Sequence, residues 1–428
     1  MQRMSTLTRR ILAQNAGRDF DRLTLKLAAL RRDAFAFFRG TNPLFLEFLP
    51  RGHFLFRAPA TLICGDLHLE NFGAFKGDNR LCYFDLNDFD EACLAPFTID
   101  IVRFVTGVMV AARGLGLDKG QSRLLVEEFL ASYARCIHDG KARWVERSLA
   151  TGVFRALLRR AMQRPRAALL DRFTKLKGGK RRMRIDGARA LALGPADRPL
   201  LKSFLAQVEM AQPNPRFFQL LDAARRIAGC GSLGLERYVM LVRGRGAPDG
   251  HFVLDLKFAA PSAVIEWLGT PQPPWASEAA RVTDVQSIMQ AIPPAMLRAV
   301  EFQGRPFVLK ELQPSIDRLD LDQWRGKFKR FAQAVAGMGR VTAWAQLRSC
   351  GRHGAASVEE LQAFVAGKRW APATVRMAEA AARRLHAAWQ TYSKDYDAGA
   401  VTVAIAPPFA RVHRVPQRAG RAKRPIAT

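Results

Sequence analysis

CGDLHLENFG, residues 64–73, and LCYFDLNDFDEA, residues 81–92, are the most informative stretches of this chain. A short β-rich run leads into the polar residues of each, at 61–64 and at 81–84, and Gly, Asp and Asn follow. Short β-rich runs bounded by such turn-forming residues are typical of strands. The sequence therefore predicts strands whose ends, and the loop between them, carry the polar side chains.

The polar side chains of these stretches are of the kind that binds a hard metal ion. Asp66, Asn71 and the aspartates after position 84 offer carboxylate and amide oxygens, which Mg²⁺ prefers as ligands. Several carboxylates close together repel one another, and a cation relieves that repulsion. The simpler alternative is that Asp and Asn only cap the turns between strands. We favour a metal site with Asn71 and a downstream Asp as ligands and Asp66 as a base.

The chain of 428 residues is strongly basic. It has 67 Lys and Arg against 38 Asp and Glu, a formal net charge of +29. Such an excess indicates an anionic partner, such as a nucleotide, a nucleic acid, a phosphorylated metabolite or an acidic membrane surface. A compositional bias towards Arg is the alternative. The most basic segment, 155–184, carries twelve Lys and Arg against the single acid Asp171, as a solvated face or an arm for an anionic substrate would.

The cysteines and the apolar runs favour a cytoplasmic protein. The six cysteines form no Cys-x-x-Cys pair and no zinc-binding spacing, which favours reduced thiols. The N-terminus, MQRMSTLTRR, has no apolar signal core. The most apolar run, 94–112, is interrupted by Asp100 and Arg103, so we expect no membrane span.

A glycine-rich motif, GCGSLG at 229–234, is the second informative feature. Glycines in this spacing approach phosphates either in a dinucleotide-binding fold or in a kinase-type loop. The first alternative requires a helix to follow and an acid about twenty residues further on, where Asp255 does stand. The sequence instead predicts a hairpin, because 237–242 is β-rich and 251–258 alternates between two faces. Lys257 is therefore the candidate phosphate-binding lysine, the alternative being a solvated lysine on an edge strand.

Taken together, these patterns predict an α+β chain in five regions. Residues 1–50 are helical, 51–215 hold the polar loops and a basic helical arm, and 216–318 are β-rich. Residues 319–407 have helical spacing, and 408–428 form a Pro- and Arg-rich tail that we expect to be disordered.

Most of the chain resembles a bacterial family known as domain of unknown function 2252. That family is in turn similar to a distant branch of the aminoglycoside phosphotransferases and protein kinases, whose catalytic loop also places an Asp and an Asn five residues apart. The segments that carry the resemblance are AFAFFRGTN (34–42), CGDLHLENFGAF (64–75), DLNDFDEACLAPFTIDIVRF (85–104), GCGSLGLERY (229–238), LDLKFAAPSA (254–263), RVTDVQSIMQA (281–291) and the region 310–317.

The resemblance implies roles for individual residues in the polar stretches. Asp66 takes the position of the catalytic base and Asn71 that of a metal ligand. Asp88 takes that of the main metal carboxylate, for which Asp85 and Asp90 are rivals. The implied cofactors are ATP and Mg²⁺.

The glycine-rich loop and Lys257 would hold the phosphates of the nucleotide. Asp284 would pair with Lys257, but Glu278 is an alternative, because Asp is one methylene shorter than the Glu expected there. The residues implied in nucleotide binding are Gly229, Gly231, Ser232, Gly234, Lys257 and Asp284.

The order of the motifs differs from that in ordinary kinases. There the glycine-rich loop and its lysine precede the catalytic loop, whereas here they follow it by about 160 residues. A circular permutation would reconcile the two orders, since termini that lie close in space make a permutation tolerable. The resemblance therefore implies a circularly permuted, two-lobed, protein-kinase-like fold whose small β-rich lobe is 216–318.

The expected activity is the transfer of the ATP γ-phosphoryl group to a hydroxyl of an acceptor, an anionic small molecule or a protein. Two alternatives stay open. The chain could bind a nucleotide as a pseudokinase or transfer AMP as a regulator, or it could bind nucleic acid through 155–184 and the tail. The nucleic-acid alternative has no helix-turn-helix signature and no basic patch interleaved with aromatic residues in its favour.

Overall fold

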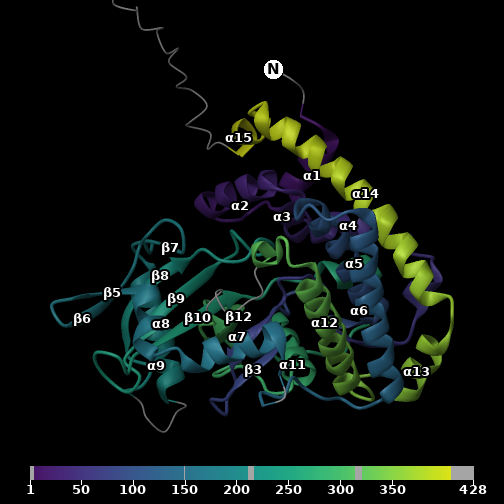
Figure 1. Ribbon diagram of the computed structural model, residues 1–428. Helices are drawn as coiled ribbons and strands as arrows, with labels where there is room; N and C mark the ends of the chain where they lie inside the picture. The colour runs from purple at the N-terminus through teal and green to yellow at the C-terminus, as the bar shows by residue number, and fades with distance from the viewer. Residues whose placement is uncertain (1–3, 149, 211–215, 314–320, 406–428) are drawn as a thin grey trace, which may run out of the picture.

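The computed structural model describes residues 4–148, 150–210, 216–313 and 321–405, which contain both helices and sheet (Figure 1). This confirms the predicted α+β class. The predicted tail, 408–428, lies outside the described residues. Within the described ranges, no helix combines the length and the apolarity needed to cross a membrane.

An antiparallel sheet of six strands forms one side of the molecule (Figure 1). The strand order is β11-β12-β10-β9-β8-β7, so that β10 lies inside the sheet between β9 and β12. The hairpin predicted after the glycine-rich motif is present as β9 and β10. The strands are β7 (Ala190–Leu191), β8 (Leu220–Arg226), β9 (Arg237–Val242), β10 (Phe252–Phe258), β11 (Arg298–Phe302) and β12 (Arg305–Glu311).

Both faces of β10 are covered, because successive side chains of a strand point to opposite faces. Leu254 lies in one apolar cluster with Leu201 of α9 (Asp197–Met210). Val253 lies in a second cluster on the other face, the face that Lys257 shares. A lysine on such a strand needs an anionic partner, because burying an unpaired charge is costly.

Long helices form the other side of the molecule (Figure 1). α6 packs against α12, and α5 packs against α14. These helices are α5 (Thr98–Gly114), α6 (Lys119–Asp139), α12 (Phe328–Ser349) and α14 (Trp370–Asp397).

Two short antiparallel strand pairs carry the polar stretches. β1 pairs with β4, and β2 pairs with β3, so that polar residues follow β1 and β3 as predicted. α11 contacts both these short strands and the large sheet, since it packs on β1 and β4 as well as on β11 and β12. The elements are β1 (Ala60–Ile63), β2 (Phe72–Lys76), β3 (Cys82–Leu86), β4 (Cys93–Pro96) and α11 (Glu278–Met289).

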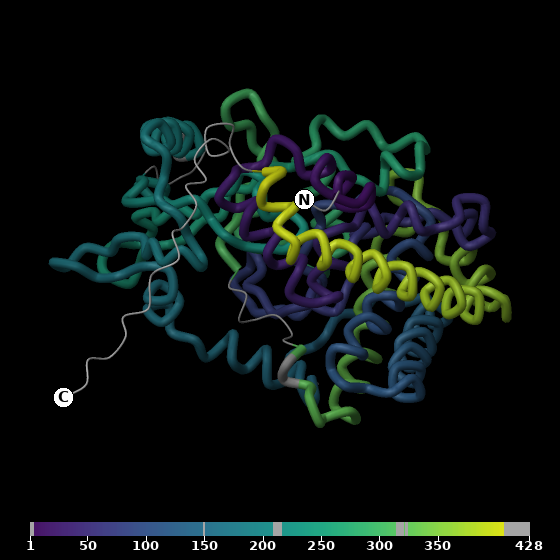
Figure 2. Tube along the Cα trace, turned by 90° about the horizontal axis from the view of Figure 1, so that it is seen from above, coloured from purple at the N-terminus to yellow at the C-terminus, as the bar shows by residue number. Residues whose placement is uncertain are grey.

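Helices from the two ends of the described chain lie side by side (Figures 1 and 2). The Tyr392 hydroxyl of α14 donates a hydrogen bond to the Leu27 carbonyl (2.8 Å), and Arg31 forms an ion pair with Asp397 (2.8 Å). The helical prediction for residues 1–50 is confirmed in the described part. Its main helices are α1 (Thr6–Gln14), α2 (Phe20–Arg32), α3 (Ala34–Gly40) and α4 (Asn42–Glu47).

The basic segment 155–184 differs in part from the prediction. Its helices are present as α7 (Gly152–Gln163) and α8 (Arg166–Phe173). The Gly178-Gly179 turn, however, joins two strands that the sequence analysis did not predict. They are β5 (Thr174–Lys177) and β6 (Lys180–Met183), which pair as an antiparallel ribbon.

We expect Gly339→Ala to destabilise the protein by about 1–3 kcal/mol, the usual cost of overpacking. Gly339 of α12 faces α6 so closely that an added Cβ would lie 2.5 Å from the Phe129 carbonyl oxygen and 3.3 Å from the Tyr133 nitrogen. These are backbone atoms, so relieving the clash requires the two helices to move apart. Thermal unfolding measures the loss.

Gly114→Ala is the matched control. Gly114 ends α5, and an added Cβ there would meet no atom within 4 Å. Its substitution should be neutral or should stabilise the helix by up to about 1 kcal/mol. Equal unfolding temperatures for the two variants would contradict the close approach of α6 and α12.

Candidate active site

A buried carboxylate holds the turn after β1. Asp100, in the first turn of α5, accepts hydrogen bonds from the backbone N–H groups of Cys64 (3.0 Å) and Gly65 (2.9 Å). Gly65 has a φ of +76°, and a Cβ there would collide with the Glu91 carbonyl, so this turn requires glycine. Burial raises the pKa of Asp100 to about 7. The turn presents the following residue, Asp66, in a fixed direction.

Arg103 orients Asp66. Its Nε donates to Asp66 Oδ1 (2.8 Å), and its Nη2 donates to the Phe38 carbonyl (2.8 Å). The guanidinium group is fully buried over the rings of Phe38 and Phe45, 3.5 and 4.6 Å from their centroids. Burial raises the pKa of Asp66, although the Arg103 charge opposes this shift. The position thus combines a fixed carboxylate with an increased affinity for a proton.

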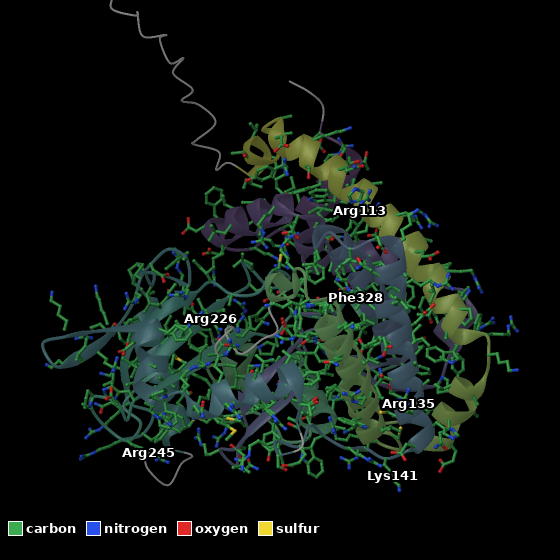
Figure 3. The ribbon with its side chains drawn as sticks, viewed as in Figure 1. Arg113, Arg135, Lys141, Arg226, Arg245 and Phe328 are labelled. Atoms are coloured by element: carbon green, nitrogen blue, oxygen red, sulfur yellow. The ribbon has the colours of Figure 1, made fainter. Side chains whose placement is uncertain are left out.

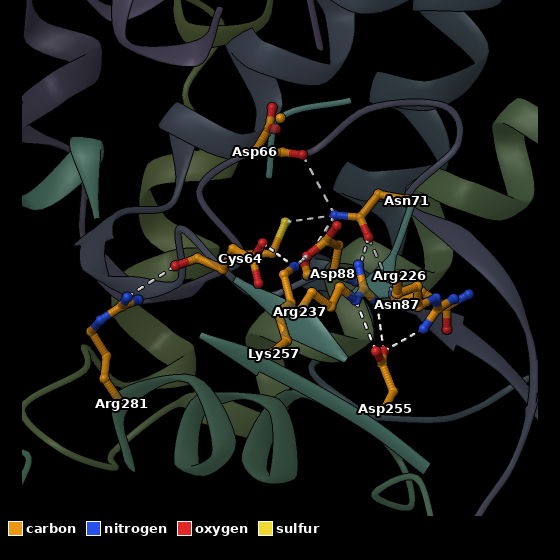
Figure 4. A network of polar contacts seen from close by, with 12 residues as sticks. Cys64, Asp66, Asn71, Asn87, Asp88, Arg226, Arg237, Asp255, Lys257 and Arg281 are labelled. Atoms are coloured by element: carbon orange, nitrogen blue, oxygen red, sulfur yellow. Dashed lines mark hydrogen bonds and ion pairs between the residues drawn. The ribbon is translucent and has the colours of Figure 1, made fainter. Parts of the chain in front are cut away.

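Asn71 fixes the loop after β3 against the turn after β1. Its side-chain oxygen accepts hydrogen bonds from the backbone N–H groups of Asn87 (3.2 Å) and Asp88 (2.7 Å). Its amide nitrogen donates to the carbonyls of Asp88 (3.1 Å) and Asp66 (3.5 Å) (Figure 4). Both acceptor positions of the Asn71 oxygen are thereby used. The sequence analysis had expected the Asn71 oxygen to bind a metal ion. In this arrangement it instead positions the backbone of Asp88.

Lys257 of β10 reaches the carboxylates that follow β3. Its Nζ forms an ion pair with Asp90 and lies 3.8 Å from Asp88 Oδ1. The Lys257 side chain is 11% exposed, whereas those of Asp88 and Asp90 are 38% and 36% exposed. The structure therefore brings together Lys257 and Asp88, which lie far apart in the sequence, beside a surface that solvent or a ligand can reach.

The expected partners of Lys257 on α11 lie elsewhere. Glu278 pairs with Arg281 (2.6 Å), and Asp284 is exposed. The ion pair of Lys257 with Asp284 is thus replaced by the pair with Asp90. The fully buried Arg281 connects α11 to the same loop, because its Nη2 donates to the carbonyl of Asp90 (2.9 Å).

Two further acids that the sequence analysis considered have structural partners. Asp85 is buried, accepts a hydrogen bond from the backbone N–H of Ala291 (3.0 Å) and pairs with Arg348 of α12 (3.0 Å), so it is no rival for the metal. Asp255 pairs within the sheet with Arg226 and Arg237 (Figure 4). Burial alone would raise the pKa of Asp255, but these two arginines lower it well below its usual range. Asp255 is therefore not placed to bind a ribose, which removes the dinucleotide-binding alternative.

The glycine-rich loop joins β8 to β9 and is held by the N-terminal segment. The Gly231 carbonyl accepts hydrogen bonds from Arg18 (2.8 Å) and from Lys26 of α2 (2.6 Å). Arg18 also donates to the Leu233 carbonyl (2.8 Å). Gly229 and Gly234 have φ values of +76° and +94°, which glycine adopts without strain. These three hydrogen bonds to carbonyl groups of the loop hold it in place.

One cavity of about 1020 Å³ is lined by the polar stretches and by the glycine-rich loop. Asp66, Asp88 and Asp90 line it from the polar stretches, and the loop lines it with Gly229, Gly231, Ser232 and Gly234. Its volume is at the upper end of the range for small-molecule sites. The cavity is therefore large enough for a large small-molecule ligand.

The carboxylates of this cavity suit Mg²⁺ shared with a substrate. Among the described residues, no group of three or more His, Cys, Asp or Glu is arranged to hold a metal by itself. Mg²⁺ commonly takes only one or two protein carboxylates and completes its shell with substrate phosphates and water. Asp88 and Asp90 fit that requirement as partly exposed carboxylates beside Lys257.

Sequence reasoning missed two buried side chains that position the site, Arg103 and Lys26. Arg103 had been noted only as a charge that interrupts an apolar run. It follows Asp100 by three positions, so both charges lie on one buried face of α5. A pair of charges at helical spacing in an apolar run was the available signal. Lys26 carried no comparable signal, because its carbonyl partner is 205 residues away.

Lys26→Met should remove a pH dependence of stability above pH 7. Burial and the nearby Arg18 lower the pKa of Lys26 to about 7, whereas the unfolded chain keeps the usual value near 10.5. Between these values the unfolded state binds more protons, so the wild-type protein gains stability as pH rises. We expect the unfolding free energy of wild type relative to Lys26→Met to increase by a few kcal/mol from pH 7 to pH 10.

Urea unfolding at several pH values measures this difference. Lys202→Met is the matched control, since Lys202 is exposed on α9 and its substitution should leave the pH dependence unchanged. A constant difference between wild type and Lys26→Met over this range would show that the Lys26 amine stays protonated in the folded protein.

Comparison with known proteins gives a family and no function. No curated protein and no solved structure matches the chain. A family model described as an uncharacterised protein conserved in bacteria, DUF2252, matches residues 18–395, which include the N-terminal segment, both polar stretches, the glycine-rich loop and the long helices. The chain therefore belongs to the bacterial family DUF2252.

Proposed function

We propose that the protein transfers the γ-phosphoryl group of ATP to a hydroxyl group of an acceptor, with Mg²⁺. The main support for this proposal is that Lys257 lies next to Asp88 and Asp90. These two carboxylates line a cavity together with Asp66 and the glycine-rich loop. Phosphoryl transfer needs these parts: donors for the phosphates, oxygens for the metal and a carboxylate near the attacking hydroxyl.

The order of elements in the sheet supports a permuted kinase-like arrangement. In protein kinases the phosphate-binding lysine lies on the third strand and a helix follows it. Here β8, the glycine-rich loop, β9 and β10 follow one another, Lys257 lies on the third of these strands, and α11 comes before β11. α2 and α14, which come from opposite ends of the described chain, pack together, which meets the spatial requirement for a permutation.

The phosphates would lie between the glycine-rich loop and Lys257. Asp88 and Asp90 would hold Mg²⁺, which, when bound, neutralises phosphate charge and orients the γ-phosphoryl group. Asn71 and Arg281 act on this pair of carboxylates indirectly, through the backbone of Asp88 and Asp90. Such preorganisation is the main means by which a protein accelerates phosphoryl transfer.

Asp66 would accept the hydrogen bond of the acceptor hydroxyl. The Arg103 interaction keeps one Asp66 oxygen in a constant position. In the reaction the acceptor oxygen forms a bond to the γ-phosphorus, the bond from that phosphorus to the bridging oxygen of ADP breaks, and the hydroxyl proton passes to Asp66. The raised pKa of Asp66 favours this last step.

Mg-ATP should raise the unfolding temperature of the wild-type protein by about 3 °C or less. A ligand at about 100 times its dissociation constant adds roughly 2.7 kcal/mol, and a chain of this size shifts little per kcal/mol. Lys257→Ala and Asp88→Ala should lose the shift, since one loses a phosphate contact and the other a metal ligand.

Lys202→Ala, an exposed lysine of α9, should keep the full shift and serves as the control for charge. ATP with EDTA in place of Mg²⁺ should give little or no shift. If millimolar Mg-ATP leaves the wild-type unfolding temperature unchanged, the nucleotide site is refuted.

Asp66→Asn should abolish transfer and retain the Mg-ATP shift, because Asn keeps an oxygen for Arg103 but cannot take the proton. The assay incubates the protein with ATP and a bacterial metabolite extract and follows radioactive label into new products. Label from γ-labelled ATP, absent with α-labelled ATP, indicates phosphoryl transfer, whereas label from α-labelled ATP indicates AMP transfer. Turnover by Asp66→Asn at the wild-type rate would refute Asp66 as the base.

A further inference from the structure

The β5–β6 ribbon extends away from the body of the molecule in two perpendicular views (Figures 1 and 2). It forms a two-stranded sheet of its own, whose tip is the turn at Gly178 and Gly179 with φ values of +56° and +72°. The cavity of the candidate active site does not include any ribbon residue among its described lining. The ribbon thus lies outside the cavity.

The register of the ribbon places four cations on one face. Lys175 lies opposite Arg182, and Lys177 lies opposite Lys180. Residues directly opposite one another, and residues two apart on one strand, share a face. All four side chains are exposed, whereas Thr174, Arg181 and Met183 on the other face are buried against the body.

This cationic face is unfavourable for the folded protein by itself. Like charges directly opposite one another destabilise a strand pair. The nearby acids do not relieve the repulsion, because Asp171 and Asp249 pair with Arg181 on the other face (2.6 Å each). Among the described residues, no carboxylate forms an ion pair with any of the four cations. An anionic partner outside the chain would remove this cost.

We infer that this ribbon binds the phosphates of double-stranded DNA. Lys175 and Lys177 are about 6.8 Å apart along the strand, which is twice the 3.4 Å rise per phosphate of one DNA strand. A two-stranded ribbon also has the width that the major groove of B-form DNA admits. The cations thus match the ligand in charge and in spacing, and contacts to phosphates position a protein without reading the base sequence.

A groove suits this ribbon better than a flat membrane surface. Leu176 is 55% exposed, but it lies on the face opposite the cations. A bilayer that met the cationic face would leave Leu176 in water, whereas the phosphates of a groove need to meet only the cationic face, since most of the other face packs against the body. Double-stranded RNA suits it less, because the major groove of the A-form is too narrow for side chains to enter.

The test measures binding of the full chain to a fluorescein-labelled DNA duplex of about 24 base pairs by anisotropy, between 50 and 300 mM salt. We expect wild-type affinity to fall steeply with salt. The variant Lys175→Ala/Lys177→Ala/Lys180→Ala should bind at least about tenfold more weakly at 100 mM salt, and its slope of log affinity against log salt should be shallower by about 2.7, since each phosphate contact contributes about 0.9.

The matched control is Lys119→Ala/Lys141→Ala/Lys368→Ala. It removes the same charge from exposed positions on α6, after α6 and near α13 (Val358–Ala366), and Lys141 lies at the opposite end of the molecule from the ribbon (Figure 3). We expect its affinity and slope to stay within about twofold of wild type. Equal losses in the two triple variants would show that only the overall charge matters and would overturn the assignment of the site.

Two further ligands complete the test. An RNA duplex of the same length and vesicles containing anionic phosphatidylserine should each bind more weakly than DNA and depend less on the three ribbon lysines. A ribbon variant that loses vesicle binding or RNA binding and keeps DNA binding would overturn the proposal, as would a wild-type protein that does not bind the DNA duplex at 50 mM salt. Circular dichroism of both triple variants should match wild type, because all six lysines are exposed.

Discussion

Two buried charges on one face of α5, Asp100 and Arg103, are the constraint on which the site depends. Both side chains are fully buried, and an acid or a base in that position is costly unless hydrogen bonds and a counter-charge compensate it. Asp100 binds the backbone of the turn before Asp66, and Arg103 binds the Asp66 carboxylate. Because each interaction would leave a buried charge uncompensated if it broke, Asp66 has one stable position.

The sheet supplies the second constraint. β10 lies inside the sheet, so the position of Lys257 is determined by strands on both sides. The charge of its ammonium group is then compensated by the carboxylates of the loop after β3. Asn71 holds that loop from the opposite side through the backbone of Asp88. Local hydrogen bonds thus position Asp66 and Asp88, and the large sheet positions Lys257. The two parts meet where Lys257 pairs with the carboxylates beside the cavity.

The sequence was informative where the signal is local. Turn residues and β-rich runs predicted the strand ends at Asp66 and Asp88, and alternation predicted the strand of Lys257. Partners across the fold were less accessible: the lysine pairs with Asp90 and not with Asp284, because the relative position of α11 and the loop depends on Arg281, a contact between distant segments. Asn71 was assigned to a metal by its residue type, whereas its oxygen binds backbone N–H groups that composition does not reveal. The β5–β6 ribbon was missed since basic residues obscure its short alternation.

The net charge of +29 does not carry over to the candidate active site, where acids and bases are paired. Asp88 and Asp90 are partly exposed in the cavity, so they would repel the phosphates of a nucleotide unless a metal ion accompanied it. The excess of cations is therefore no argument for ATP. On the ribbon the reverse holds, because four exposed cations face one another without a carboxylate, and there a bare polyanion meets attraction alone. The two proposed sites would thus separate two anions by how each is neutralised: the nucleotide would carry its own Mg²⁺ to the carboxylates of the cavity, and DNA would exchange its counterions for the lysines of the ribbon.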